Sequence, residues 1–113
     1  MADSPRLPAT LEARLADPGA LVPVIVQQVE SNEVLMLAWM NRQALLATIE
    51  SGAATYWSRS RNELWVKGAT SGNTQRMHSI DLDCDSDALL MMVDQNGAAC
   101  HTGSRTCFGQ RII

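Results

Sequence analysis

The stretch VPVIVQQVESNEVLMLAWM, residues 22–40, decides the class of fold. Its first part, from Val22 to Val26, is rich in β-branched residues, which pack well on the pleated surface of a strand. Ser31-Asn32 has the composition of a turn, and the segment from Val34 to Met40 is typical of a returning strand. The stretch therefore predicts a β-hairpin.

The main helix is expected directly after this hairpin. Asn41 is a favourable N-cap, because its side-chain oxygen can accept a hydrogen bond from the first helical turn. Leu45, Leu46 and Ile49 recur at helical spacing, and Gly52 is suited to ending a helix in a left-handed conformation. We therefore predict one helix over residues 42–51.

The remainder of the chain is predicted to form mostly strands. Turn signals lie near Arg61-Asn62 and at Asn96-Gly97, and residues 68–73 are a loop of small polar side chains. Four further strands are predicted, at residues 54–58, 64–67, 74–83 and 88–94. The predicted fold is therefore α+β, with mostly antiparallel strands and one main helix.

The length of 113 residues predicts a single domain spanning residues 1–113. Residues 1–20 are expected to form a peripheral N-terminal segment, in which Leu7, Leu11 and Leu15 make one stripe of a short helix that ends by Pro18-Gly19. The first residues lack the apolar core of a signal peptide. The chain also lacks a stretch of about 18 uncharged apolar residues, which argues against a membrane span.

Composition narrows the class of function. The chain is 46% hydrophobic and carries a formal net charge of −3, so we exclude long disorder and nucleic-acid binding by bulk charge. An odd count of three cysteines in a chain with no export signal predicts reduced thiols in the cytoplasm.

The acidic run Asp81-Leu82-Asp83-Cys84-Asp85-Ser86-Asp87 is the first candidate site. In an extended segment, Asp83, Asp85 and Asp87 would point to one face and Cys84 to the other. Clustered carboxylates suit Mg²⁺, which prefers oxygen ligands. An EF-hand loop is excluded, because Ser86 stands where that loop needs Gly. The alternative is an acidic turn with an incidental cysteine.

The cysteines form the second candidate site. Cys84, Cys100 and Cys107 contain no C-x-x-C pair, which argues against a zinc ribbon or a thioredoxin-like motif. Three thiols suit a three-ligand zinc with an open fourth position, as in catalytic zinc sites. His101, next to a thiol, and His78 are candidate bases. The alternative is that the cysteines are small buried hydrophobes.

A basic, glycine-containing segment forms the third candidate site. Backbone N–H groups, hydroxyls and cations in such a segment can bind phosphate. Its candidate residues are Arg59, Arg61, Lys67, Thr70, Ser71, Gly72 and Asn73. The alternative is a polar connecting loop with exposed basic neighbours. Together, the three sites predict a hydrolase for a phosphorylated small molecule. Two rivals are a non-enzymatic module stapled by zinc and a Mg²⁺-dependent phosphohydrolase.

Five sequence strings resemble those of the phosphoribosyl-AMP cyclohydrolase family of histidine biosynthesis. They are LAWMN at 37–41, YWSRSR at 56–61, WVKGATSGN at 65–73, LDCDSD at 82–87, and ACHTG at 99–103 continuing to Cys107-Phe108. One departure is Ala69, where many members have Glu, so no role of that acid is assumed for this chain.

The resemblance implies hydrolysis of the N1–C6 bond of the adenine ring of phosphoribosyl-AMP by a cytoplasmic, intertwined homodimer. It implies zinc bound by Cys84, Cys100 and Cys107 across the subunit interface. It also implies Mg²⁺ bound by Asp83, Asp85 and Asp87. Since the chain ends at Ile113, we expect the monofunctional form. We expect hydroxide on zinc to attack C6, with His101 as first choice for proton transfer and His78 as second.

Overall fold

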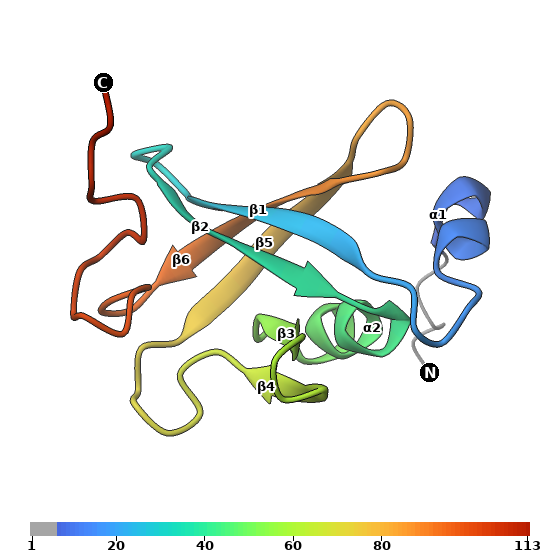
Figure 1. Ribbon diagram of the computed structural model, residues 1–113, viewed down its shortest axis with the longest axis horizontal. Coiled ribbons are helices and arrows are strands. Elements are labelled where there is room, and N and C mark those ends of the chain that lie inside the picture. Colours follow the sequence, from blue (N-terminus) through green and yellow to red (C-terminus); the bar gives the residue numbers. More distant parts are fainter. Residues whose placement is uncertain (1–6) are drawn as a thin grey trace.

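The computed structural model describes residues 7–113, and residues 1–6 of the expected N-terminal segment lie outside this range. Two helices and six strands follow one another along the chain (Figure 1). They are α1 (Ala9–Arg14), β1 (Val22–Gln28), β2 (Val34–Met40), α2 (Arg42–Ser51), β3 (Thr55–Ser58), β4 (Glu63–Val66), β5 (Gln75–Leu82) and β6 (Leu89–Gln95).

The main sheet has the strand order β2-β1-β6-β5. The predicted hairpin of β1 and β2 is confirmed, and both Glu30 and Asn32 in its turn have positive φ. Strands β5 and β6 also pair antiparallel, whereas β1 and β6 pair parallel. The α+β class with mostly antiparallel strands is therefore confirmed. The sequence signals did not predict the one parallel pair.

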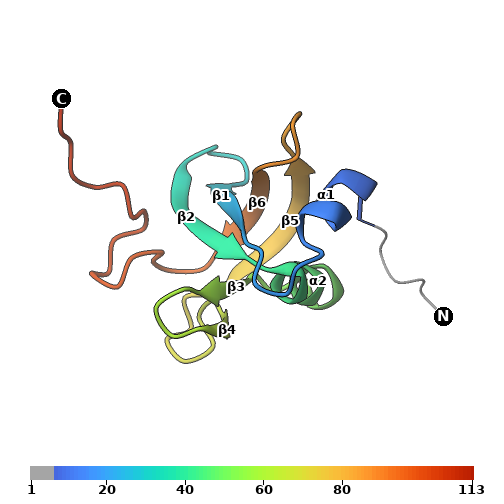
Figure 2. The ribbon, with the colours of Figure 1, turned by 45° about the vertical axis from the view of Figure 1, so that its right-hand side comes forward.

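Helix α2 begins and ends where its capping residues predicted. The Asn41 side chain accepts a hydrogen bond of 2.8 Å from the Ala44 backbone N–H, and Gly52 takes the left-handed conformation with φ 77°. The buried Thr48 hydroxyl bonds to both backbone groups of Thr55. These bonds fasten the helix to β3, so α2 and the small β3–β4 sheet lie together beside the main sheet (Figure 2).

The core lies on the inner face of the main sheet. Val22, Val24 and Val26 of β1 are fully buried, as alternation in a strand requires. Tyr56 of β3 is also fully buried, while the three tryptophans are only partly buried. The core therefore depends on aliphatic side chains and one tyrosine.

The outer face of the main sheet carries exposed apolar side chains. Ile25 and Leu37 are register partners on β1 and β2, with 40% and 49% of their surface exposed. Leu90 of β6 lies beside Ile25 in the parallel pairing. We call Ile25, Leu37 and Leu90 the outer apolar face. Exposed contiguous apolar surface on a sheet is typical of an interaction site.

Helix α1 packs at the edge of the domain through the predicted leucine stripe. Leu11 and Leu15 are buried in the core, and the Ser86 hydroxyl donates to Thr10 at 2.7 Å. The helix therefore lies against the turn between β5 and β6 (Figure 1). Neither helix in residues 7–113 has the length and apolar character needed to span a bilayer.

Candidate functional site

A pocket of about 860 Å³ lies between β4 and two loops. The first loop, residues 67–74, follows β4, and the second, residues 96–107, follows β6. We call them the glycine loop and the thiol loop. Several predicted site residues line this pocket, namely Arg61, Lys67, Thr70, Ser71, Asn73, Cys100, His101 and Cys107. The fold thus brings most of the basic segment next to two of the three cysteines.

The two loops are tied to each other by hydrogen bonds. The Asn96 side chain donates to the Gly72 carbonyl at 3.0 Å, and the Asn96 backbone N–H donates to the Thr74 carbonyl at 2.9 Å. At Gly97, an added Cβ would lie 2.2 Å from Asn73 Oδ1. The Asn73 side chain of one loop therefore lies directly against Gly97 of the other and would have to move to admit a Cβ there.

Lys67 lies between the loops. Its Nζ donates to the Asn73 carbonyl at 2.8 Å and to the Ala98 carbonyl at 3.0 Å. The residue is buried, and this burial lowers the pKa of the ammonium, while the neighbouring Cys107 opposes the shift. Two of its three N–H donors thus hold the protein together, which leaves one for a ligand.

Cys100 and Cys107 both line the pocket wall, and each thiol shifts the pKa of the other. The Thr102 hydroxyl donates to Cys100 Sγ at 3.0 Å and lowers the pKa of that thiol. Burial raises the pKa of Cys107, and the neighbouring Cys100 raises it further. Cys107 is exposed and Cys100 half-buried, so both thiols are accessible. Two accessible thiols at one pocket wall are a suitable pair of donors for a soft metal.

Cys84 lies at the other end of the sheet. It occupies the turn that precedes β6, whereas the thiol loop follows β6 (Figure 1). Strand β6 has seven residues, which at about 3.3 Å per residue span about 23 Å. The three cysteines therefore cannot meet at one ion within a single chain.

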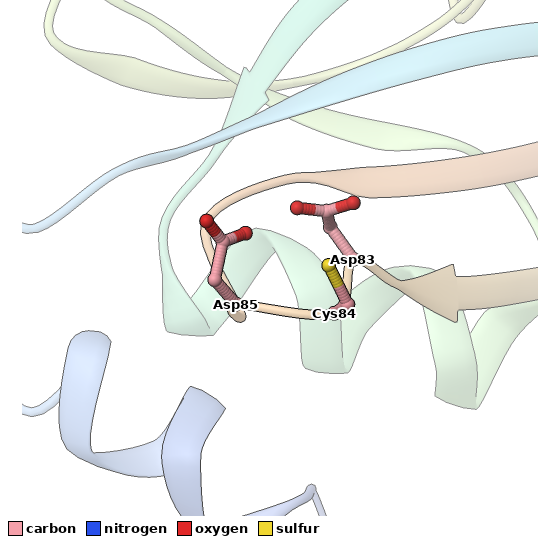
Figure 3. Close-up of side chains that lie close together, drawn as sticks. All are labelled: Asp83, Cys84 and Asp85. Carbon is pink, nitrogen blue, oxygen red and sulfur yellow. The ribbon is translucent and has the colours of Figure 1, made fainter.

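The acidic run is a turn and not an extended segment, so the expected alternation of faces is wrong. Strand β5 ends at Leu82, and the turn is closed by hydrogen bonds from Asp83 N to Ala88 O and from Ser86 N to Asp83 O. Ser86 has φ 63°. The ligand atoms of Asp83, Cys84 and Asp85 consequently lie within 4.8 Å of one another (Figure 3). The thiol shares a side with the carboxylates because the backbone bends.

The three carboxyl groups of the acidic turn perturb one another. Hydrogen bonding with Asp83 and with Asp87 raises the pKa of Asp85 to about 6. Hydrogen bonding with Asp85 and Asp87 lowers the pKa of Asp83 in return. The three carboxyl groups are therefore crowded together, as the sequence predicted. A divalent cation relieves such crowding and favours oxygen ligands.

Of the two candidate histidines and the two candidate arginines, one of each lines the pocket and the other lies outside it. His101 is exposed and lines the pocket beside the thiols, whereas His78 lies midway along β5 and outside the pocket as the described residues define it. Arg61 lines the pocket. Arg59 instead places its guanidinium 4.5 Å from the centre of the Trp39 ring, on the side of the outer apolar face.

Two buried glutamines behind the thiol loop were missed by the sequence reasoning. Gln75 and Gln95 are 1% and 5% exposed, and the Gln95 side chain donates to the backbone of the thiol loop. Both could have been found from the sequence, because strand alternation places both side chains on the inner face of the sheet. A glutamine at such a position needs a polar partner.

The chain matches a family model described as phosphoribosyl-AMP cyclohydrolase over residues 36–109. It is 64% identical over 105 residues to a phosphoribosyl-AMP cyclohydrolase of Thermobifida fusca, covering 92% of this chain and 90% of the relative. It is 61% identical over 97 residues to the phosphoribosyl-AMP cyclohydrolase of Micrococcus luteus, covering 86% and 77%. The Herminiimonas arsenicoxydans protein of the same name is 62% identical over 97 residues, covering 85% and 72%.

Proposed function

Because this chain belongs to the phosphoribosyl-AMP cyclohydrolase family, we propose that it opens the adenine ring of phosphoribosyl-AMP by hydrolysis, as a step of histidine biosynthesis. Water adds across the N1–C6 bond, so that C6 becomes a carboxamide carbon and N1 gains a proton. The observation that carries the proposal is the pocket, because it combines a thiol pair, an adjacent histidine and a basic, hydroxyl-bearing loop.

The pocket has the chemistry needed for a phosphorylated nucleotide. Leu64 and Trp65 give it an apolar wall, which suits the flat face of a purine. Arg61, Thr70 and Ser71 supply a cation and two hydroxyls for the phosphates. We keep Gly72 and Asn73 as parts of the same loop, where backbone N–H groups can also donate. Arg59 is left out of this phosphate-binding group, because in the single chain its guanidinium stacks on the Trp39 ring.

The donor set fits zinc only if two copies of the chain combine. Cys100 and Cys107 supply two adjacent thiols, and Cys84 of a second copy supplies the third. When bound, zinc would lower the pKa of a water at its open position, which is the chemistry that hydrolysis of an amidine needs. The separation of Cys84 from the other two cysteines within one chain supports this shared arrangement.

The outer apolar face supports a homodimer. Ile25 and Leu37 leave 40% and 49% of their surface exposed in one copy, and a homodimer interface is richer in apolar area than ordinary surface. In a dimer with a two-fold axis, the outer apolar face of one copy would pack against the same face of the other. We propose that this face forms the dimer and carries the acidic turn of each copy toward the pocket of the other.

Mg²⁺ is the cation proposed for the acidic turn. Asp83, Asp85 and Asp87 offer only oxygen donors, and the crowding that raises the pKa of Asp85 is relieved when a cation binds. In the proposed dimer this turn would face the basic pocket, where Mg²⁺ held by these carboxylates would offset the negative charge of substrate phosphate. The thiols require reducing conditions, so we propose a cytoplasmic enzyme.

His101 is proposed to move the proton. It lines the pocket next to Cys100 and is exposed, so its imidazole can accept a proton from the attacking water and return it to N1. His78, the second candidate of the sequence, lies on β5 away from the pocket residues. We therefore assign the proton transfer to His101 alone.

Metal analysis of the purified protein, combined with an absorbance assay on phosphoribosyl-AMP, tests the proposal. We expect one zinc per chain and a spectral change as the purine ring opens. The variants Cys100→Ser and Cys107→Ser should lose both zinc and activity. His101→Ala should lower kcat and retain zinc. Release of phosphate without loss of the purine chromophore would instead indicate a phosphohydrolase.

A further inference from the structure

A chain of buried hydrogen bonds connects the core to the thiol loop. The Tyr56 hydroxyl donates to Gln75 Oε1 at 2.5 Å, and Gln75 Nε2 donates to Gln95 Oε1 at 2.8 Å. Gln95 Nε2 then donates to the Arg105 carbonyl at 2.8 Å and to the Gly97 carbonyl at 3.1 Å. All three side chains are buried. We call this chain of bonds the glutamine relay.

The direction of the relay is fixed by chemistry. A backbone carbonyl can only accept, so Gln95 must present its NH₂ group to Gly97 and Arg105. Its carboxamide oxygen then faces Gln75, which must present its own NH₂ group. A rotated Gln95 carboxamide would place its oxygen against two carbonyl oxygens and its NH₂ against another NH₂. The buried carboxamide therefore holds one orientation.

The relay ends at the neck of the thiol loop. Gly97 and Arg105 lie on opposite sides of this loop, and the Ala99 N–H donates to the same Arg105 carbonyl at 3.1 Å. Cys100 follows Ala99 inside the segment that these contacts close, and Cys107 lies two residues after Arg105. The Cys107 N–H donates to the Leu35 carbonyl at 2.7 Å. One NH₂ group thus draws together the two sides of the loop that carries both thiols.

We infer that Gln95 is a positioning residue for the thiol pair: its buried carboxamide closes the neck of the thiol loop and so holds Cys100 and Cys107 side by side. The inference rests on the proposed function only in treating these thiols as metal ligands. The nearness of the two thiols is a property of one chain, because both line the same pocket. It can therefore be measured both with and without metal.

The metal-free measurement is the ease of forming the Cys100–Cys107 disulfide. Glutathione disulfide oxidises the two thiols and is itself reduced to two glutathione molecules, so the equilibrium gives an effective thiol concentration. Peptide mapping counts this disulfide separately from any reaction of Cys84. Gln95→Met removes the N–H donors at nearly constant size. We expect it to lower the effective concentration on the order of tenfold.

Tyr56→Phe is the matched control. It removes the first donor of the glutamine relay but leaves Gln95 bonded to the loop, so it perturbs the buried network without opening the neck. We expect its effective thiol concentration to stay within about twofold of the parent. Gln95→Asn keeps a carboxamide and shortens its reach by one methylene. Gln95→Asn should behave like Gln95→Met. If Gln95→Met does not fold, Gln95→Asn takes its place in the comparison.

The second readout is zinc affinity of the full chain, measured by competition with a chelator. Loss of a residue that orients metal ligands typically costs about 10–100-fold in affinity, so we expect Gln95→Met to lose that much and Tyr56→Phe little. Unchanged disulfide equilibria in both Gln95 variants, or an equal loss in Tyr56→Phe, would overturn the inference. A lowered disulfide equilibrium in a protein that binds no zinc would uphold the inference and refute the proposed metal site.

Discussion

Replacing Gly68 by alanine tests how tightly the glycine loop is built. Gly68 has φ +79°, and a Cβ at this position would lie 2.4 Å from the Asn73 carbonyl carbon and 2.5 Å from the Thr74 nitrogen. Both are backbone atoms, so relief requires the chain itself to move. The carbonyl of Asn73 is also the acceptor for Lys67 Nζ at 2.8 Å. The substitution therefore acts on a bond within the glycine loop, made by the same ammonium that also bonds to the Ala98 carbonyl of the thiol loop.

The size of the effect follows from two contributions. A left-handed conformation costs a residue with a Cβ about 1–2 kcal/mol. Loss of the bond from the Lys67 ammonium costs about 1.5–3 kcal/mol more. We expect Gly68→Ala to lower the free energy of unfolding by about 2.5–5 kcal/mol, a large part of the stability of a small domain.

Gly72→Ala is the matched control, because it lies in the same loop with φ +82° and no described atom lies within 4 Å of its added Cβ. It should cost only the conformational contribution, about 1–2 kcal/mol. Urea unfolding followed by tryptophan fluorescence measures both variants. Equal losses for the two substitutions would refute the close-packing argument, since they share the φ contribution and differ only in the clash.

Three further changes probe the cap, the lysine and the outer apolar face. Asn41→Ala should lower the free energy of unfolding by about 1 kcal/mol, because it removes the bond to the Ala44 N–H; an unchanged urea midpoint would contradict this. Lys67→Met should cost about 2 kcal/mol by leaving two carbonyls unpaired, and a raised KM with full stability would show instead that this ammonium serves the substrate. Leu37→Lys should convert the proposed dimer to a monomer in sedimentation velocity. Ile112→Lys, in the exposed C-terminal tail, should leave it dimeric. If both variants stay dimeric, the outer apolar face is not the interface.

Local signals predicted the local structure well. Asn41 and Gly52 set both ends of α2, and each is explained by hydrogen bonding or backbone freedom within a few residues. The β1–β2 hairpin and the turn at Asn62, with φ 55°, were likewise predictable. These features depend on neighbours in sequence, so composition and spacing were sufficient to find them.

Features that depend on distant residues were not predictable in the same way. The parallel pairing of β1 with β6 joins segments more than sixty residues apart, and no local pattern encodes it. The acidic run looked extended by alternation, yet the antiparallel pairing of β5 with β6 requires a turn there. Lys67 was assigned to phosphate from its charge, and no sequence pattern indicated that its ammonium also bonds two backbone carbonyls. Each of these features depends on tertiary packing, which patterns of neighbouring residues do not reveal.

The central claim, that Cys84 of one copy joins Cys100 and Cys107 of another, is tested most directly by subunit complementation. Cys84→Ser and Cys107→Ser should each be inactive alone. After the two are unfolded together and refolded, about half of the dimers are mixed and each holds one intact site, so about a quarter of parent activity should return. Recovery of phosphoribosyl-AMP hydrolysis at that level is the predicted result. A mixture as inactive as its components, or an active Cys84→Ser protein alone, would contradict the shared site.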